Sequence, residues 1–362
     1  MDRPPDSHSP DRVERHLDRG LALGFGKQPG PEPPSVLQRL AAVTGGSQMV
    51  SLRDPDHAAP EPLLKPLAPE SGARAGKYVI QGELGSGGVG AVHRGHDQDL
   101  GRDVALKFLH DRYRDQPQFV QRFVEEAQIG GQLQHPGIVP VYDFGLADDR
   151  PFFAMKLVKG QTLAAALADR DSPADERTRF LGVFEQVCQT IAYAHARGVV
   201  HRDLKPANVM IGSFGEVQVV DWGMGKVLRS GGVADERRAT DGQSDQPPVA
   251  TVRTGRPGSH SVAGSVFGTP AYMAPEQARG DIEQMDERSD VFALGAILCE
   301  ILTGHPPYSG TDEQVLAKAA AADCREAAGR LATCGAGHEL IALTTRCLAA
   351  TNRQRPRNAA VV

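Results

Sequence analysis

One polar segment of the chain, residues 201–210, holds three side chains whose types and spacing suit chemistry on a phosphate group. It reads His-Arg-Asp-Leu-Lys-Pro-Ala-Asn-Val-Met. Asp203 can accept a proton from a hydroxyl group, the Lys205 ammonium can neutralise charge on a transferring group, and the Asn208 carbonyl oxygen can ligate a hard divalent cation. The segment therefore predicts phosphoryl transfer, with an ordinary polar loop between helix and strand as the alternative.

A glycine-rich turn is expected between two short strands upstream of this segment. At Gly85, Gly87 and Gly90, the missing Cβ lets the backbone approach phosphate oxygens closely. The G-x-G-x-x-G spacing alone is a weak signal, because a dinucleotide-binding turn shares it. That turn needs a helix directly after the glycines, whereas the β-branched Val92 and a second strand pattern follow here. The pattern therefore favours a phosphate-covering hairpin.

Regular patterns around the polar segment indicate the elements that must position it. Apolar residues at helical spacing predict a helix over residues 176–197, and β-rich runs predict strands at 209–211 and 217–220. Residues 290–302 are apolar on nearly all sides, which is typical of a helix in the centre of a lobe. The segment is thus expected to lie between a buried helix and a strand pair.

A further helix is predicted over residues 118–134, after a strand that carries Lys107. Gly130 and Gly131 fall inside the helical pattern, and each costs about 1 kcal/mol relative to alanine. We therefore expect this helix to end early unless it is packed. Strands are expected next, at residues 135–143 and 152–158.

The order and spacing of these motifs resemble the protein kinase superfamily, and their spelling is similar to bacterial eukaryote-like serine/threonine kinases. The resemblance covers about residues 78–362. It rests on seven motifs, which are the glycine turn, residues 104–107, Glu126, residues 201–208, residues 221–223, residues 268–276 and residues 290–295. It implies an α+β, two-lobed fold with a small β-rich N-lobe (78–158) containing one key helix and a larger, mainly helical C-lobe (159–362). The last helix would be cut short at Val362.

By resemblance, the chain uses ATP and Mg²⁺. Asp203 would receive the proton of the substrate hydroxyl, and Lys205 would shield the γ-phosphoryl group. Asn208 and Asp221 would hold the metal. The residue after Asp221 departs from the family's phenylalanine, but Trp222 keeps a large aromatic ring for packing.

The resemblance also implies a nucleotide site between the lobes. Lys107 would orient the phosphates while paired with Glu126, although an error of one residue would choose Glu125. At the position of Lys156 the family often has an acidic residue. The contact of Lys156 with adenine would be through its backbone. The other residues implied for this site are Leu84, Gly85, Gly87, Gly90, Val92, Ala105, Met155, Val158 and Met210.

The segment from residue 221 to residue 276 is long for the family, and the resemblance implies regulation by autophosphorylation within it. Arg202 could grip a phosphate bidentately, and Thr269 would contact Asp203 and Lys205. Asp290 would cap the catalytic-loop backbone, although a simple helix N-cap is the local alternative. The remaining regulatory or structural candidates are the possible phosphosites Ser259, Ser261 and Ser265, and the pair Glu276 and Arg355. For each serine taken singly, an unmodified loop residue is the favoured alternative.

Composition limits the remaining possibilities. The 362 residues carry a formal net charge of -5, which gives no sign of nucleic-acid binding, and five cysteines without a C-x-x-C pair indicate a reducing compartment. No signal peptide and no stretch of about 18 apolar residues is found. We expect a cytoplasmic protein without membrane contact through these residues, while a region beyond Val362 could still hold an anchor.

Residues 1–75 contain 12 of the 26 prolines. Such a composition cannot bury enough apolar surface to offset conformational entropy, so this region is predicted to be mostly disordered.

Two other functions remain to be weighed against a protein kinase that acts on serine or threonine and self-associates for autophosphorylation. One is a pseudokinase scaffold, which normally lacks a catalytic or metal-binding residue; none is missing here. The other is a small-molecule phosphotransferase on a related fold. Lys205-Pro206 and residues 268–276 argue against it, because in the family they form a platform for protein substrates.

Overall fold

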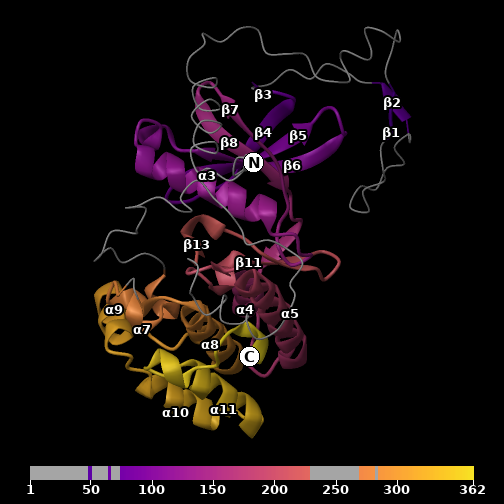
Figure 1. The fold of residues 1–362 in the computed structure, drawn as a ribbon. Coiled ribbons are helices and arrows are strands. Elements are labelled where there is room, and N and C mark those ends of the chain that lie inside the picture. The colour runs from indigo at the N-terminus through magenta and orange to yellow at the C-terminus, as the bar shows by residue number, and fades with distance from the viewer. Residues whose placement is uncertain (1–47, 51–63, 67–73, 229–268, 282–283) are drawn as a thin grey trace, which may run out of the picture.

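The computed structural model of the chain describes residues 48–50, 64–66, 74–228, 269–281 and 284–362. These residues form two lobes, a sheet with one long helix above and a group of helices below (Figure 1). The predicted α+β, two-lobed architecture is confirmed.

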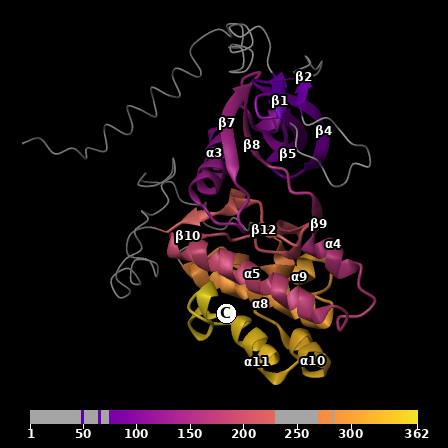
Figure 2. The same cartoon turned by 90° about the vertical axis from the view of Figure 1, so that its right-hand side faces the viewer.

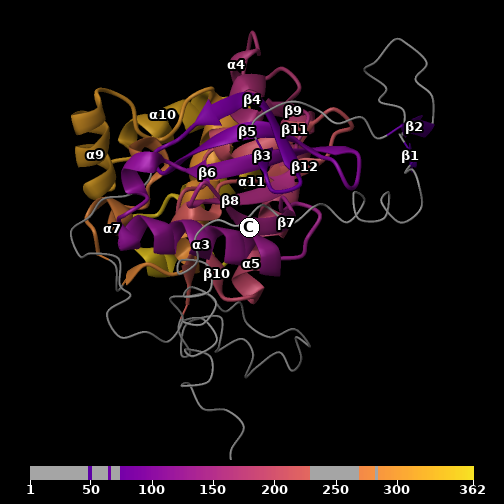
Figure 3. The same ribbon diagram turned by 90° about the horizontal axis from the view of Figure 1, so that it is seen from above.

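Six antiparallel strands build the N-lobe sheet, in the order β3-β4-β5-β6-β8-β7 (Figure 3). Tyr78, Phe108 and Phe152 are buried at its centre, and the rings of Phe108 and Phe152 stack with centroids 5.4 Å apart. The strands are β3 (Arg74–Ala75), β4 (Tyr78–Ser86), β5 (Gly90–Asp97), β6 (Arg102–Leu109), β7 (Val141–Ala147) and β8 (Arg150–Lys156).

Two predicted boundaries in this lobe are wrong. The strand expected at residues 135–143 begins at Val141, because the chain from His135 to Pro140 forms a turn and loop instead. The sheet also begins earlier than residue 78, since β3 pairs with β4 and Ala75 is fully buried. Residues 1–75 further contain the antiparallel pair β1 (Gln48–Val50) and β2 (Leu64–Pro66), while the expectation that this region is mostly disordered stays a prediction.

The helix α3 (Pro117–Gln132) follows the short 3-10 turn η1 (Asp111–Tyr113). It continues through Gly130 and Gly131, and an early end was expected only for a helix that is not packed. Packing is the reason, because Gly130 is buried and a Cβ added there would lie 2.8 Å from a methyl group of Val141 on β7. Gly131 has open space around it. One glycine therefore permits close helix–sheet contact, and the other has no such role.

The C-lobe is organised around α8 (Glu287–Thr303), which is buried on nearly all sides and packs against α5 (Arg177–Ala196) (Figure 2). Its further helices are α4 (Leu163–Ala168), α7 (Pro275–Ala278), α9 (Asp312–Ala320), α10 (Arg325–Thr333) and α11 (His338–Cys347), with 3-10 turns η2 (Pro206–Asn208), η3 (Trp222–Met224), η4 (Pro270–Tyr272), η6 (Asn352–Gln354) and η7 (Ala359–Val361). Short strands lie between the lobes, namely β9 (Gly160–Thr162), β10 (Val199–Val200), β11 (Val209–Gly212), β12 (Val217–Val219) and β13 (Lys226–Val227).

All five cysteines are free thiols, three of them buried. In the part of the chain that the structure describes, no helix combines the length and the apolar character needed to cross a membrane.

A buried ion pair joins two distant parts of the C-lobe. Both guanidinium amino groups of Arg355 donate to the Glu276 carboxylate, at 2.8 and 3.0 Å, and Ser289 Oγ donates to it at 2.8 Å. Burial alone would raise the pKa of Glu276, but these hydrogen bonds and the charge of Arg355 bring it below its usual value. The stability that this carboxylate provides is therefore present at neutral pH and is lost as the pH falls through the lowered pKa of the folded state.

We expect Glu276→Gln to lower the free energy of unfolding at pH 7 by about 3–5 kcal/mol, because Arg355 then remains buried without a counter-charge. Thermal unfolding measures the loss. Arg325→Ala removes a surface ion pair with Asp323, in which the Arg325 side chain is 89% exposed. This variant should leave the midpoint of thermal unfolding unchanged. Equal midpoints for wild type and Glu276→Gln would contradict a stabilising role for the pair.

The two glycines of α3 provide a second test. Gly131→Ala is expected to raise the free energy of unfolding by up to about 1 kcal/mol, since alanine is the better helix former. Gly130→Ala should give less, because its Cβ meets Val141. If chemical denaturation finds the Gly130→Ala protein to be the more stable of the two, packing does not explain why the helix continues.

Candidate active site

The polar segment at residues 201–205 is anchored from below by a buried carboxylate. Asp290, in the first turn of α8, accepts hydrogen bonds from the backbone N–H groups of His201 at 2.7 Å and Arg202 at 2.8 Å. The N-cap of α8 is Asp286, so the alternative role for Asp290 as a helix cap is excluded. Arg202 has a φ of 69°, a left-handed conformation that costs energy for a residue with a Cβ. Asp290 therefore holds a strained backbone in place.

His195, on the buried face of α5, is a residue that the sequence interpretation missed. Its Nε2 lies 2.9 Å from Oδ2 of Asp290, and its Nδ1 accepts from the Ala359 N–H at 3.4 Å. These partners assign the proton to Nε2. Burial raises the pKa of Asp290, but the hydrogen bond from His195 and the neighbouring backbone donors lower it overall. A polar residue within the apolar pattern of that helix was the available signal.

The predicted catalytic side chains lie together above this anchor. Lys205 Nζ donates to Asp203 Oδ2 and to Thr269 Oγ1, both at 2.8 Å. The Thr269 N–H donates to Asp203 Oδ1 at 3.2 Å. Asn208 Nδ2 donates to the Asp203 carbonyl at 2.8 Å and to its carboxylate at 3.2 Å. Segments 66 residues apart are thus joined by one cation and one carboxylate.

Asn208 and Asp221 are close because of the strand pairing between them. Val209 on β11 pairs with Val219 on β12, and the Val220 N–H donates to the Asn208 carbonyl at 2.9 Å. The Asn208 amide nitrogen is used by Asp203, which leaves its side-chain oxygen for another partner. Asp221 has a φ of 63° and a side chain that is 47% exposed. An amide oxygen and a carboxylate in this arrangement are ligands that fit Mg²⁺.

Trp222 supports Asp221 by packing, as the sequence predicts for a large aromatic residue. The indole is buried, its ring centroid lies 4.6 Å from that of His201, and its Nε1 donates to the Val219 carbonyl at 3.4 Å. Trp222 therefore connects the two segments through their apolar side.

An ion pair connects the N-lobe sheet to α3. Lys107 Nζ on β6 lies 2.5 Å from Oε1 of Glu126 and 3.4 Å from Oδ1 of Asp221. The choice between Glu125 and Glu126 is thereby settled for Glu126. A Cβ on Gly223 would lie 2.9 Å from Oε2 of Glu126, so the glycine leaves room for this carboxylate.

The charges of this cluster support one another. Burial would lower the pKa of Lys107, but Glu126 and Asp221 raise it overall. Burial would raise the pKa of Asp221, yet the Lys107 ammonium lowers it overall. Burial and the charge of Asp221 raise the pKa of Glu126, against the opposing effect of Lys107. Lys107 and Asp221 are therefore the members of the cluster whose charged forms are favoured.

The glycine turn lies between β4 and β5, closed by a hydrogen bond of 2.9 Å from the Gly87 N–H to the Gly90 carbonyl. Gly85 has open space where a side chain would be, as expected for a backbone that must approach a ligand. Gly90 is different, because a Cβ there would overlap the Phe108 carbonyl on β6. The sheet itself therefore requires a glycine at position 90, and phosphate approach at Gly85, Gly87 and Gly90 stays a prediction. Leu84 is 53% exposed beside this turn.

The residues predicted to surround adenine occupy strands on both sides of the connection between the lobes. Ala105 pairs with Met155, and Val92 pairs with Lys107. Lys156 ends β8, and its N–H donates to the Pro140 carbonyl at 3.1 Å. Val158 follows in the linking segment before β9. On the other side, Met210 lies on β11, paired with Thr162.

The regulatory prediction is described in part. The Arg202 carbonyl accepts from Gln277 Nε2 at 2.9 Å, which connects the catalytic loop to α7. The predicted phosphosites Ser259, Ser261 and Ser265 lie outside the described residues.

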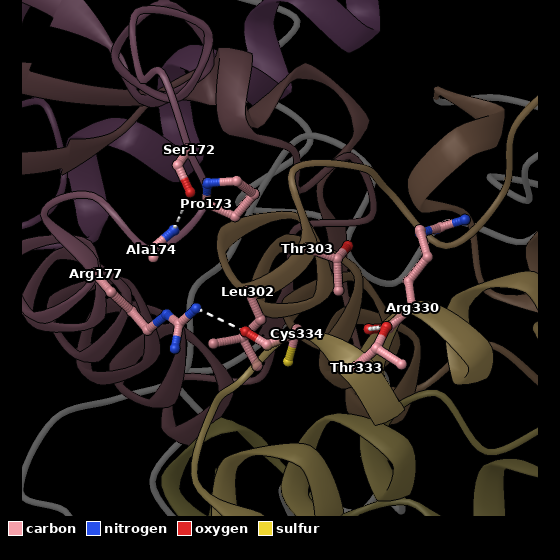
Figure 4. Close-up of a pocket in the computed structure, with 9 residues that line it drawn as sticks. All are labelled: Ser172, Pro173, Ala174, Arg177, Leu302, Thr303, Arg330, Thr333 and Cys334. Carbon is pink, nitrogen blue, oxygen red and sulfur yellow. Dashed lines mark hydrogen bonds between the residues drawn. The ribbon is translucent and has the colours of Figure 1, made fainter.

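A separate cavity of about 270 Å³ lies in the C-lobe, between the loop that precedes α5, the end of α8 and α10 (Figure 4). Arg177 reaches across it to the Cys334 carbonyl at 2.9 Å. None of the predicted site residues lines this cavity, so it is distinct from the candidate active site. Its lining residues are Ser172, Pro173, Ala174, Arg177, Leu302, Thr303, Arg330, Thr333 and Cys334.

Comparison with known proteins agrees with this geometry. The family model described as protein kinase domain matches residues 78–362. Serine/threonine-protein kinase PknD of Chlamydia muridarum is 35% identical over 241 residues, which are 64% of this chain and 25% of that protein. Serine/threonine-protein kinase PknB of Mycobacterium tuberculosis (strain H37Rv) is 36% identical over 238 residues, which are 65% of this chain and 33% of that protein.

The matches thus cover a third or less of these relatives' length. The family match extends over most of the chain and includes the segments that carry Lys107, Asp203 and Asp221. The chain belongs to the protein kinase family.

Proposed function

We propose that the protein is a Mg²⁺- and ATP-dependent serine/threonine protein kinase, acting through the predicted site residues. The observation that carries this proposal is the position of Lys107. Its ammonium lies within 4 Å of carboxylates from α3 and from the start of η3, so that one cation joins the N-lobe sheet to the proposed metal site. The relatives named as serine/threonine-protein kinases support the same function.

Asn208 and Asp221 would hold Mg²⁺, and Lys107, kept in place by Glu126, would orient the α- and β-phosphates. When bound, Mg²⁺ would neutralise charge on the phosphates. Phosphoryl transfer passes through a loose transition state, which depends on this neutralisation. The open space at Gly85 allows the backbone of the glycine turn to cover the phosphates. Adenine would contact the Lys156 carbonyl and the Val158 N–H, between Val92 and Ala105 above and Met210 below.

Asp203 would accept the proton of the substrate hydroxyl. The hydroxyl oxygen would form a bond to the γ-phosphorus, and the bond from that phosphorus to the leaving ADP would break. Lys205 lies between Asp203 and Thr269, where its ammonium can shield the γ-phosphoryl oxygens. Most of the acceleration would come from positioning and charge neutralisation.

Protein serine and threonine hydroxyls are the proposed acceptors. The contact from Lys205 to Thr269 supports this, because it places the segment that leads into α7 beside the catalytic base. Autophosphorylation between self-associated copies would regulate the enzyme, with Arg202 binding a phosphate on Ser259, Ser261 or Ser265. We place this domain in the cytoplasm.

Asp203→Asn is expected to lower kcat about 10²–10⁴-fold, because the proton acceptor is lost. Lys107→Met should lower kcat/KM about 10²–10³-fold, since one charged donor is removed from the phosphates. Transfer of labelled phosphate from Mg·ATP to the chain itself and to a generic protein acceptor measures both. Arg325→Ala, an exposed variant far from the site, serves as the control and should match wild type.

The same assay distinguishes the alternatives. No transfer by the wild-type chain would favour a scaffold, and transfer to small molecules alone would favour a small-molecule phosphotransferase. Wild-type turnover in Asp203→Asn or Lys107→Met would overturn the assigned roles. Mapping the labelled residues tests the choice of serine and threonine over tyrosine.

A further inference from the structure

The side chain of Lys156 has no role in the proposed function, in which its backbone alone contacts adenine. Its Nζ lies 3.8 Å from Oε1 of Glu216, and both side chains are 35% exposed. Lys156 ends the N-lobe strand β8, and Glu216 directly precedes the C-lobe strand β12. The ion pair therefore crosses the connection between the lobes.

The Glu216 carboxylate is held in place rather than free to rotate. Its Oε2 accepts a hydrogen bond from the Phe214 N–H at 3.1 Å. It lies directly over the Gly212 backbone, where any Cβ would collide with it. The Glu216 carbonyl also accepts from the Gly212 N–H at 2.8 Å. Because this acceptor is already ordered, the pair costs less side-chain entropy than an ordinary surface ion pair.

The hairpin that carries Glu216 also carries Met210, the proposed apolar floor of the adenine site. Met210 pairs with Gln218 within the hairpin and with Thr162 on β9. The linking segment contacts the same hairpin at a second point, where Ser213 N–H and Oγ donate to the Lys159 carbonyl at 3.0 and 3.2 Å. This hairpin thus connects Met210, the floor of the site, to the linking segment whose backbone would hydrogen-bond adenine.

We infer that Lys156 and Glu216 are positioning residues for ATP, whose ion pair keeps the hinge edge at a fixed distance from the β11–β12 floor. This inference rests on the proposed function. The attraction is lost when the lobes separate, so the pair favours the closed arrangement that contacts both faces of adenine. It should act on nucleotide affinity and leave the chemical step unchanged.

The test compares Lys156→Glu, Glu216→Lys and the double variant that exchanges the two charges. Each single reversal should raise the KM for ATP about two- to fivefold with kcat unchanged, as expected for one partly exposed pair. The exchange should restore the wild-type KM. Lys318→Glu provides a matched control, because Lys318 pairs with Glu326 at 2.8 Å on the C-lobe surface, away from the nucleotide site.

Binding of a fluorescent ATP analogue, measured in parallel, separates the possible failures. Wild type that binds no nucleotide would overturn the proposed function. Wild type that binds and turns over ATP, with single variants of equal KM, would overturn only this inference. A double variant as weak as the sum of its singles would show that the pair itself is not the cause. The effects of the single variants on the KM for ATP should also be smaller at about 0.5 M salt, where exposed charges are strongly screened.

Discussion

The Asp290 carboxylate is the interaction on which the catalytic loop depends. A carboxylate with no exposed surface is expensive to bury, and it is tolerated when hydrogen bonds compensate the charge. Asp290 has such donors in the backbone of His201, the backbone of Arg202 and the ring of His195. In return it holds Arg202 at a positive φ. The strained turn that precedes Asp203 is thus stabilised by a carboxylate of α8, a helix buried on nearly all sides.

Above Asp290, two lysine side chains each connect two segments of the site. Lys205 divides its hydrogen bonds between Asp203 and Thr269, and Lys107 lies between Glu126 and Asp221. A cation with two partners from different segments makes the position of each partner depend on the other. Displacing α3 would remove Glu126 and leave Lys107 with Asp221 alone.

Glycine provides close approach at several of these contacts, for physically different reasons. Gly223 leaves room for the Glu126 carboxylate, and Gly212 leaves room for that of Glu216. Gly130 lets α3 contact β7, and Gly90 lets β5 contact β6. Except at Gly212, whose partner Glu216 lies in the same hairpin, the partner comes from another element of the fold. A glycine in a motif can therefore be required by the packing of the protein itself.

The sequence by itself predicted phosphoryl-transfer chemistry, because Lys107, Asp203, Asn208 and Asp221 stand in short segments whose residue types and order resemble those of protein kinases. The order of the motifs, through its resemblance to protein kinases, also predicted the two-lobed class. The tertiary structure alone decided between Glu126 and Glu125, continued α3 through Gly130 and began β7 at Val141. It also brought His195 to Asp290 and Lys156 to Glu216. These outcomes depend on atoms that are far apart in the chain, and propensity describes only neighbours within a few residues.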